Sequence, residues 1–197
     1  MKFIESINDF IGLFIIAVLV VCLALFMQNN YNNLTYVTST VDNRRYLVRN
    51  INDKQEAADM LAAINQKLEK LKKHLEQTYP DDERSARINS NYVPENVCES
   101  VAHDQNTSYS VNKGEKVVFC IRSKENNKLE DLNTLTFVAI HELGHLASGT
   151  VGHNDEFWAN FKFLLKEAIA IGLYEKVEYS KDPKSYCGIQ ITDSPVE

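Results

Sequence analysis

A glutamate flanked by two histidines at helical spacing could hold a metal ion and activate water. In the segment HELGH, residues 141–145, His141 and His145 stand four positions apart and Glu142 follows the first of them. On an α-helix such histidines share one face and can bind one ion, while Glu142 is offset by about 100° and can reach a water on that ion. Zinc is the natural candidate, since a catalytic zinc site takes three protein ligands and one water. The pattern predicts a hydrolytic zinc centre.

The third metal ligand has to come from outside this motif, and two residues are candidates. His153 follows after Gly149 and Gly152, which would let the chain end one helix and turn back sharply. Asn154 would then cap the next helix and direct His153 toward the metal. The alternative is Glu167 on that next helix, as in thermolysin-like enzymes. We prefer His153 and keep Glu167 as the alternative.

One class of zinc enzyme is excluded, and one structural alternative stays open. The metzincin pattern HExxHxxGxxH needs glycine and histidine where this chain has Ser148 and Val151. The histidines could also be structural side chains packed in an ordinary helical hairpin. The apolar residues on both sides of the motif, at 134–140 and 146–147, favour a buried active-site helix instead.

The elements that must position these side chains follow from the hydrophobic pattern. Helices are expected over about 135–148 and 154–173. The alternating side chains of 116–122 predict a strand. Apolar residues recur at spacings of three and four along 53–78, which predicts a long amphipathic helix. Residues 83–115 are rich in turn formers and are expected to be irregular.

The N-terminal part has a different character. Residues 10–27 contain no charged side chain and are long enough, as a helix, to approach the thickness of a hydrocarbon core. We interpret residues 1–30 as an N-terminal tail and membrane anchor, with a cleaved signal peptide and a secreted form as the alternative. Residues 31–52 are polar and are expected to be a juxtamembrane spacer. The metallopeptidase-like domain is then predicted to cover residues 53–197.

Charge bears on orientation and on partners. Lys2 precedes the apolar run and Arg44 and Arg45 follow it, a slight bias toward a cytoplasmic C-terminal domain. The chain of 197 residues has a net charge of -6 at pH 7, and its basic residues are dispersed. No nucleic-acid partner is therefore expected.

Four cysteines are present, of which Cys22 lies in the apolar run. The other three, Cys98, Cys120 and Cys187, contain no CxxC pair and are interpreted as small buried side chains. One disulfide plus a free thiol is the alternative, and it would require an oxidising compartment. The absence of a clear disulfide pattern agrees with a cytoplasmic domain.

HELGH followed by GHNDEFW, within residues 141–158, resembles the zinc-peptidase core of the WLM-domain family and, more distantly, the SprT-like proteases. This chain has two more residues before the third histidine than the WLM pattern. The wider run, with NKGE at 112–115 and YCG at 186–188, is similar to membrane-anchored metallopeptidases encoded by large DNA viruses.

The resemblance implies an α+β fold, in which a small zincin-like domain has a short sheet and an active-site helix and follows an N-terminal transmembrane helix. It also implies a membrane-anchored zinc endopeptidase that acts on proteins or peptides. His141, His145 and His153 would hold Zn²⁺, and Glu142 would take a proton from water and deliver it to the leaving amine. The alternative function is a membrane-anchored structural or interaction protein on a zinc-stabilised, catalytically silent fold.

Two further roles are expected around the metal. A tetrahedral oxyanion needs a hydrogen-bond donor, and Tyr109, His103 and Tyr174 are the candidates. The strand at 116–122, if it borders the cleft, could bind an extended substrate through its backbone.

Overall fold

A mixed five-stranded sheet is the framework of the fold in this computed structural model, which describes residues 2–102 and 104–197, without the side chains of residues 2–10 and 29–32. The strand order is β1-β2-β3-β5-β4. The pairs β1–β2 and β4–β5 are antiparallel, whereas β3 pairs in parallel with β2 and β5. The strands are β1 (Leu34–Thr38), β2 (Arg45–Arg49), β3 (Val97–Glu99), β4 (Tyr109–Val111) and β5 (Lys116–Phe119).

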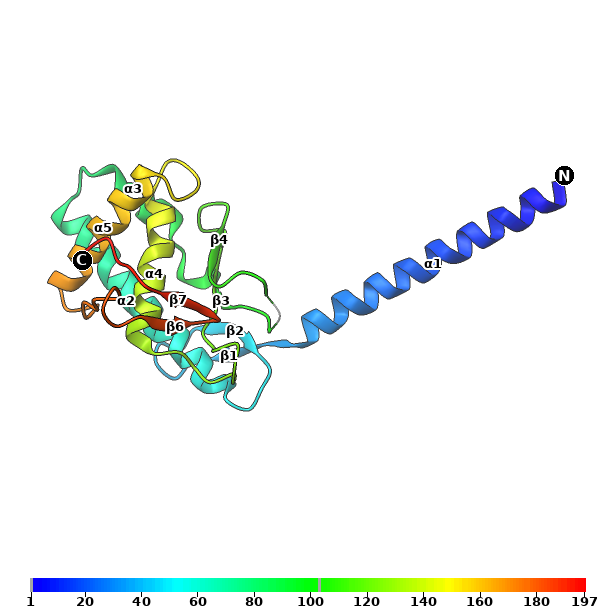
Figure 1. The fold of residues 1–197 in the computed structure, drawn as a ribbon, viewed down its shortest axis with the longest axis horizontal. Coiled ribbons are helices and arrows are strands. Elements are labelled where there is room, and N and C mark those ends of the chain that lie inside the picture. Colours follow the sequence, from blue (N-terminus) through cyan, green and yellow to red (C-terminus); the bar gives the residue numbers. More distant parts are fainter. Residues whose placement is uncertain (1, 103) are drawn as a thin grey trace.

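Helices and a small hairpin complete the structure and confirm the α+β class (Figure 1). A separate two-stranded sheet forms from the last two strands. The remaining elements are α1 (Lys2–Asn32), α2 (Lys54–Thr78), α3 (Glu83–Asn91), the 3₁₀ turn η1 (Pro94–Asn96), α4 (Leu132–Ala147), α5 (Asp155–Ala170), β6 (Lys184–Tyr186) and β7 (Ile189–Ile191).

The predicted helices are confirmed within a few residues at their ends. The apolar stripe of α2 is buried, as its spacing predicts, and α2 packs against β2 and α4. α4 is buried on nearly every side and pairs closely with α5. The side chain of Asn154 accepts a hydrogen bond from the backbone of Phe157, which confirms Asn154 as the N-cap of α5.

The spacer predicted over residues 31–52 is wrong, because these residues form the β1–β2 hairpin and join the sheet. Only Tyr46 and Val48 of β2 are buried. Two core-facing residues in a strand of five give too weak a hydrophobic alternation to stand out from their polar neighbours. Contacts with α2 also fix the hairpin, including the ion pair between Arg44 and Glu69.

The irregular segment predicted over 83–115 is also wrong in part, since α3, β3 and β4 lie within it. β3 and β4 have three residues each, too few for a periodic pattern to emerge. The strand predicted at 116–122 ends at Phe119, and Arg122 takes part only in an isolated bridge with Leu129.

α1 extends away from the rest of the chain (Figure 1). Its segment Ile11–Gln28 is long and apolar enough to cross a membrane and has 0% of its residues buried. An anchor and a signal sequence share these properties.

A disulfide joins Cys120 and Cys187, so the interpretation of these two cysteines as small reduced side chains is wrong. The alternative, one disulfide and a free buried thiol at Cys98, matches the structure. The pairing was hidden because the two cysteines are 67 positions apart and meet only when the β6–β7 hairpin folds back beside the end of β5. The bond attaches this hairpin to the main sheet.

Candidate metal centre

The helix α4 brings the first two histidines to one face. Its N-cap is Asp131, whose carboxylate accepts a hydrogen bond from the backbone of Thr134 at 2.8 Å. His141 and His145 lie in its C-terminal half, with ring centroids 5.0 Å apart. The apolar surround predicted for this helix is confirmed, since most of its residues are buried.

The third histidine joins the first two. His141, His145 and His153 each offer a nitrogen, and these atoms lie within 4.8 Å of one another. Nε2 of His153 and Nε2 of His141 are 3.0 Å apart. Ligand nitrogens of a tetrahedral zinc ion, at about 2.0–2.1 Å from the metal, are separated by about 3.3 Å. The His141–His153 separation is close to this value, and the other pairs, at up to 4.8 Å, would close by as much as about 1.5 Å for one zinc ion to be bound by all three histidines.

Burial keeps two of these imidazoles neutral. It lowers the pKa of His141 to about 3 and that of His145 to about 4, and the neighbouring imidazoles add to the effect. Metal binding requires a neutral imidazole, so neither histidine has to lose a proton at neutral pH.

Aromatic side chains of α5 pack against the three histidines. The ring of Phe157 stacks on His145 at 4.3 Å between centroids and meets His141 and His153 edge-on. A Cβ atom on Gly144 would lie 3.2 Å from Phe157 and 3.4 Å from Phe161. The absence of a side chain at Gly144 therefore lets α5 approach the histidine helix closely.

Glu142 is 4% exposed and faces the same cleft. Burial raises the pKa of its carboxyl to about 8, and a hydrogen bond from Ser110 acts in the opposite direction. Within the described residues its Oε2 atom has no hydrogen-bond partner. Since buried polar atoms are normally paired, this oxygen fits a role in binding a water or substrate group.

Glu167, the alternative third ligand, is engaged elsewhere. Its carboxylate lies 2.8 Å from Nε2 of His74 and accepts a hydrogen bond from the Tyr79 hydroxyl at 3.0 Å. Both partners belong to α2 or its C-terminal end. The structure does not bring Glu167 to the cluster of His141, His145 and His153.

The turn before His153 differs in part from the expectation. Gly152 has a positive φ of 91°, as the predicted reversal requires. Gly149 does not, and its backbone N–H instead donates to Glu156 at 2.8 Å.

His141, His145 and His153 line a cleft of about 780 Å³. Of the three candidate oxyanion donors, Tyr109 lines the cleft, Tyr174 is buried against Phe137 and Tyr179, and His103 lies outside the described residues. Tyr186 also lines it, with its hydroxyl 2.7 Å from that of Ser108. The sequence does not point to Tyr186, because the hairpin that carries it has strands of three residues each.

β4 is the edge strand that borders the cleft. β5, the strand expected to bind substrate, lies between β3 and β4, and both its edges are occupied. The expectation for residues 116–122 is therefore wrong, and the free edge belongs to β4, whose Tyr109 and Ser110 line the cleft. β4 was not predicted.

Comparison with known proteins gives a family and several viral relatives. The model of the WLM domain matches residues 95–194. An uncharacterized protein of Acanthamoeba polyphaga mimivirus is 29% identical over 185 residues, which cover 90% of this chain and 94% of that protein. An uncharacterized protein of Invertebrate iridescent virus 6 is 35% identical over 82 residues, covering 41% of this chain and 44% of the relative. Another, from Invertebrate iridescent virus 3, is 37% identical over 92 residues, covering 45% and 54%.

A solved structure is also similar. The crystal structure of Wss1 from Saccharomyces cerevisiae aligns with 61% of this chain and 82% of its own, at 17% sequence identity and a TM-score of 0.45.

Proposed function

Because this chain belongs to the WLM-domain family, we propose that it is a zinc-dependent endopeptidase that cleaves protein substrates while tethered to a membrane. The observation that carries the proposal is the cluster of His141, His145 and His153 beside a buried carboxylate, one oxygen of which has no hydrogen-bond partner among the described residues. A site that only retained metal would not require Glu142 there. The catalytically silent alternative is therefore less well supported.

The chain's own residues would divide the work as follows. The three histidines hold Zn²⁺, which supplies Lewis acidity toward a water molecule and the scissile carbonyl. Glu142 accepts the proton of the attacking water and later donates it to the leaving amine. Tyr109 and Tyr186 line the cleft and are the described hydroxyls that we propose as donors to the oxyanion.

The substrate would bind along β4. This strand has one free edge, and an extended peptide paired with it would pass the face on which Glu142 lies. Backbone pairing gives affinity with little sequence selectivity, which suits an unfolded or loosely folded protein.

The membrane tether is α1. Its segment Ile11–Gln28 makes no buried contact with the folded part, as expected of a helix that lies in lipid. The disulfide between Cys120 and Cys187 favours an oxidising compartment for the catalytic domain. This opposes the slight charge bias toward the cytoplasm, and it removes the argument that rested on unpaired cysteines.

Replacing the general base separates metal binding from hydrolysis. Glu142→Gln should keep one zinc per chain and reduce cleavage of a denatured protein by at least about 100-fold, because general-base catalysis contributes roughly that much. Zinc content and cleavage of a denatured test protein are the measurements. Glu167→Gln, a matched change outside the cluster, should leave both unchanged. A wild-type protein that holds zinc and cleaves nothing would contradict the proposed endopeptidase function. It would favour the alternative, a catalytically silent structural or interaction protein.

A further inference from the structure

The position of His153 depends on a short loop, residues 148–153, which is fixed by hydrogen bonds from other parts of the chain. His153 is exposed, and the preceding Val151 is 87% exposed. A Cβ atom on Gly152 would have no neighbour within 4 Å. The residues beside His153 therefore gain little from packing, and the loop must be fixed at its ends.

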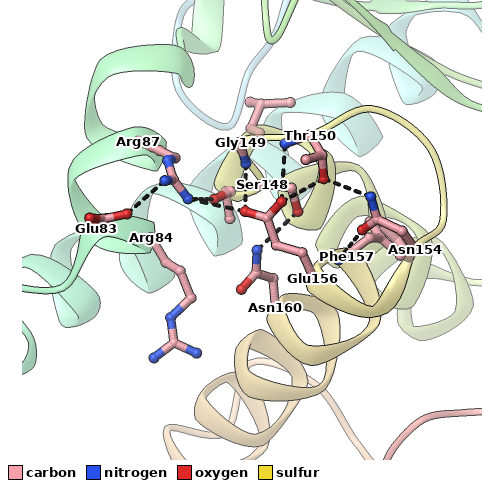
Figure 2. A network of polar contacts seen from close by, with 12 residues as sticks. Glu83, Arg84, Arg87, Ser148, Gly149, Thr150, Asn154, Glu156, Phe157 and Asn160 are labelled. Atoms are coloured by element: carbon pink, nitrogen blue, oxygen red, sulfur yellow. Dashed lines mark hydrogen bonds and ion pairs between the residues drawn. The ribbon is translucent and has the colours of Figure 1, made fainter.

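Glu156 fixes the start of this loop. One oxygen of its carboxylate accepts a hydrogen bond from the backbone of Gly149 at 2.8 Å. The other accepts two from Thr150, from the backbone at 3.1 Å and from the hydroxyl at 2.5 Å (Figure 2). A single side chain in the first turn of α5 thus binds two consecutive residues of the loop.

The neighbouring elements support the same loop. Arg87 of α3 donates to Glu156 at 3.3 Å (Figure 2). It also donates to the carbonyl of Ala147 at 3.3 Å. From the β4–β5 turn, Lys113 donates to the carbonyls of Ser148 at 2.7 Å and Thr150 at 2.6 Å. The end of α4 and the start of the loop are therefore connected to two other parts of the fold.

The far end of the loop is closed by Asn154. Its amide donates to the Thr150 hydroxyl at 2.7 Å, while its Oδ1 caps α5 (Figure 2). Thr150 and Asn154 are thus joined, and only Val151, Gly152 and His153 lie between them. When Glu156 fixes Thr150, the backbone between Thr150 and Asn154 can adopt few conformations, and this restricts where the His153 side chain can lie.

We propose that Glu156 is a positioning residue for the metal centre, which acts through the loop 148–153 to hold His153 against His141 and His145. The inference rests on the proposed zinc site, and it assigns to Glu156 a role in metal affinity without direct contact with the metal. Residues that orient metal ligands typically contribute about 10–100-fold to metal affinity.

The test is a double-mutant cycle on the full-length chain in detergent, with zinc affinity measured by competition with chromophoric chelators. Glu156→Ala should weaken zinc binding by about 10–100-fold. In a His153→Ala background the same change should have almost no further effect, because the ligand through which Glu156 acts is absent. The matched control is Asp155→Ala, which removes an exposed carboxylate from the same first turn and should leave zinc affinity unchanged.

Cobalt provides a second signature, since loss of one imidazole changes the visible spectrum of bound Co²⁺. Glu156→Ala should shift that spectrum toward the spectrum of His153→Ala. If Glu156→Ala does not fold, Thr150→Val, which removes the hydroxyl between Glu156 and Asn154, is tested in the same cycle.

Equal zinc affinity in wild type and Glu156→Ala, or an equal loss with and without His153, would overturn the inference. A wild-type chain that takes up no zinc would overturn the proposed function and this inference with it.

Discussion

At the scale of single residues, the centre combines an obvious pattern with a dependence on its surroundings. His141, Glu142 and His145 could be recognised from spacing alone, because a helix places them without help from the rest of the chain. A glycine turn and a helix cap in the sequence favour His153 over Glu167 as the third ligand. The structure brings His153 to the cluster and pairs Glu167 with His74.

Gly144 shows how a residue without a side chain supports the site. In a helix interior, Gly144→Ala would stabilise the fold by about 1 kcal/mol through helix propensity. The added methyl would press on Phe157, at 3.2 Å, and such overpacking costs about 1–3 kcal/mol. Because Phe157 stacks on His145, we expect a net loss of about 1 kcal/mol and weaker zinc binding. Thermal unfolding and chelator competition measure the two effects. A more stable protein with unchanged zinc affinity would contradict this explanation.

At the scale of elements, long helices were predictable and short strands were not. α2, α4 and α5 carry several turns of repeated apolar spacing, which a sequence displays directly. β3, β4, β6 and β7 have three residues each, and their pairing depends on partners far along the chain. The consequence for the site is specific: the edge strand β4 and the hairpin residue Tyr186, which line the cleft, were not found from the sequence.

The disulfide belongs to this scale, because it attaches the β6–β7 hairpin to the end of β5. Closing a loop across 67 positions should stabilise the fold by about 4 kcal/mol. A reductant should therefore lower the urea midpoint of the wild type markedly. It should not shift the midpoint of the double variant Cys120→Ala/Cys187→Ala. Two rapidly titrating thiols at these positions in the native, unreduced protein would contradict the pairing.

At the scale of the whole molecule, the apolar helix α1 precedes a folded part with which it makes little contact. The folded part contains the complete sheet, including the β1–β2 hairpin that the sequence assigned to a spacer. The apolar segment Ile11–Gln28 of α1 is 0% buried, so it adds little to the packing of that part.

Removing α1 should therefore separate membrane binding from folding. A fragment of residues 33–197 should unfold at the same temperature as the full chain in detergent, because the described side chains of α1 contribute nothing to the buried core. The full chain should float with lipid vesicles in a density gradient, and the fragment should stay at the bottom. A large fall in the unfolding temperature of the fragment would show that α1 packs against the rest of the chain.

The central claim is that three histidines, and no carboxylate, hold one zinc ion. The most direct test is the zinc content of the purified full-length chain after dialysis, compared with His153→Ala and Glu167→Ala. We expect one zinc per chain in the wild type and in Glu167→Ala, and a large loss in His153→Ala, because His153 is the side chain that the described residues place with His141 and His145. Loss of zinc in Glu167→Ala with full retention in His153→Ala would contradict the account.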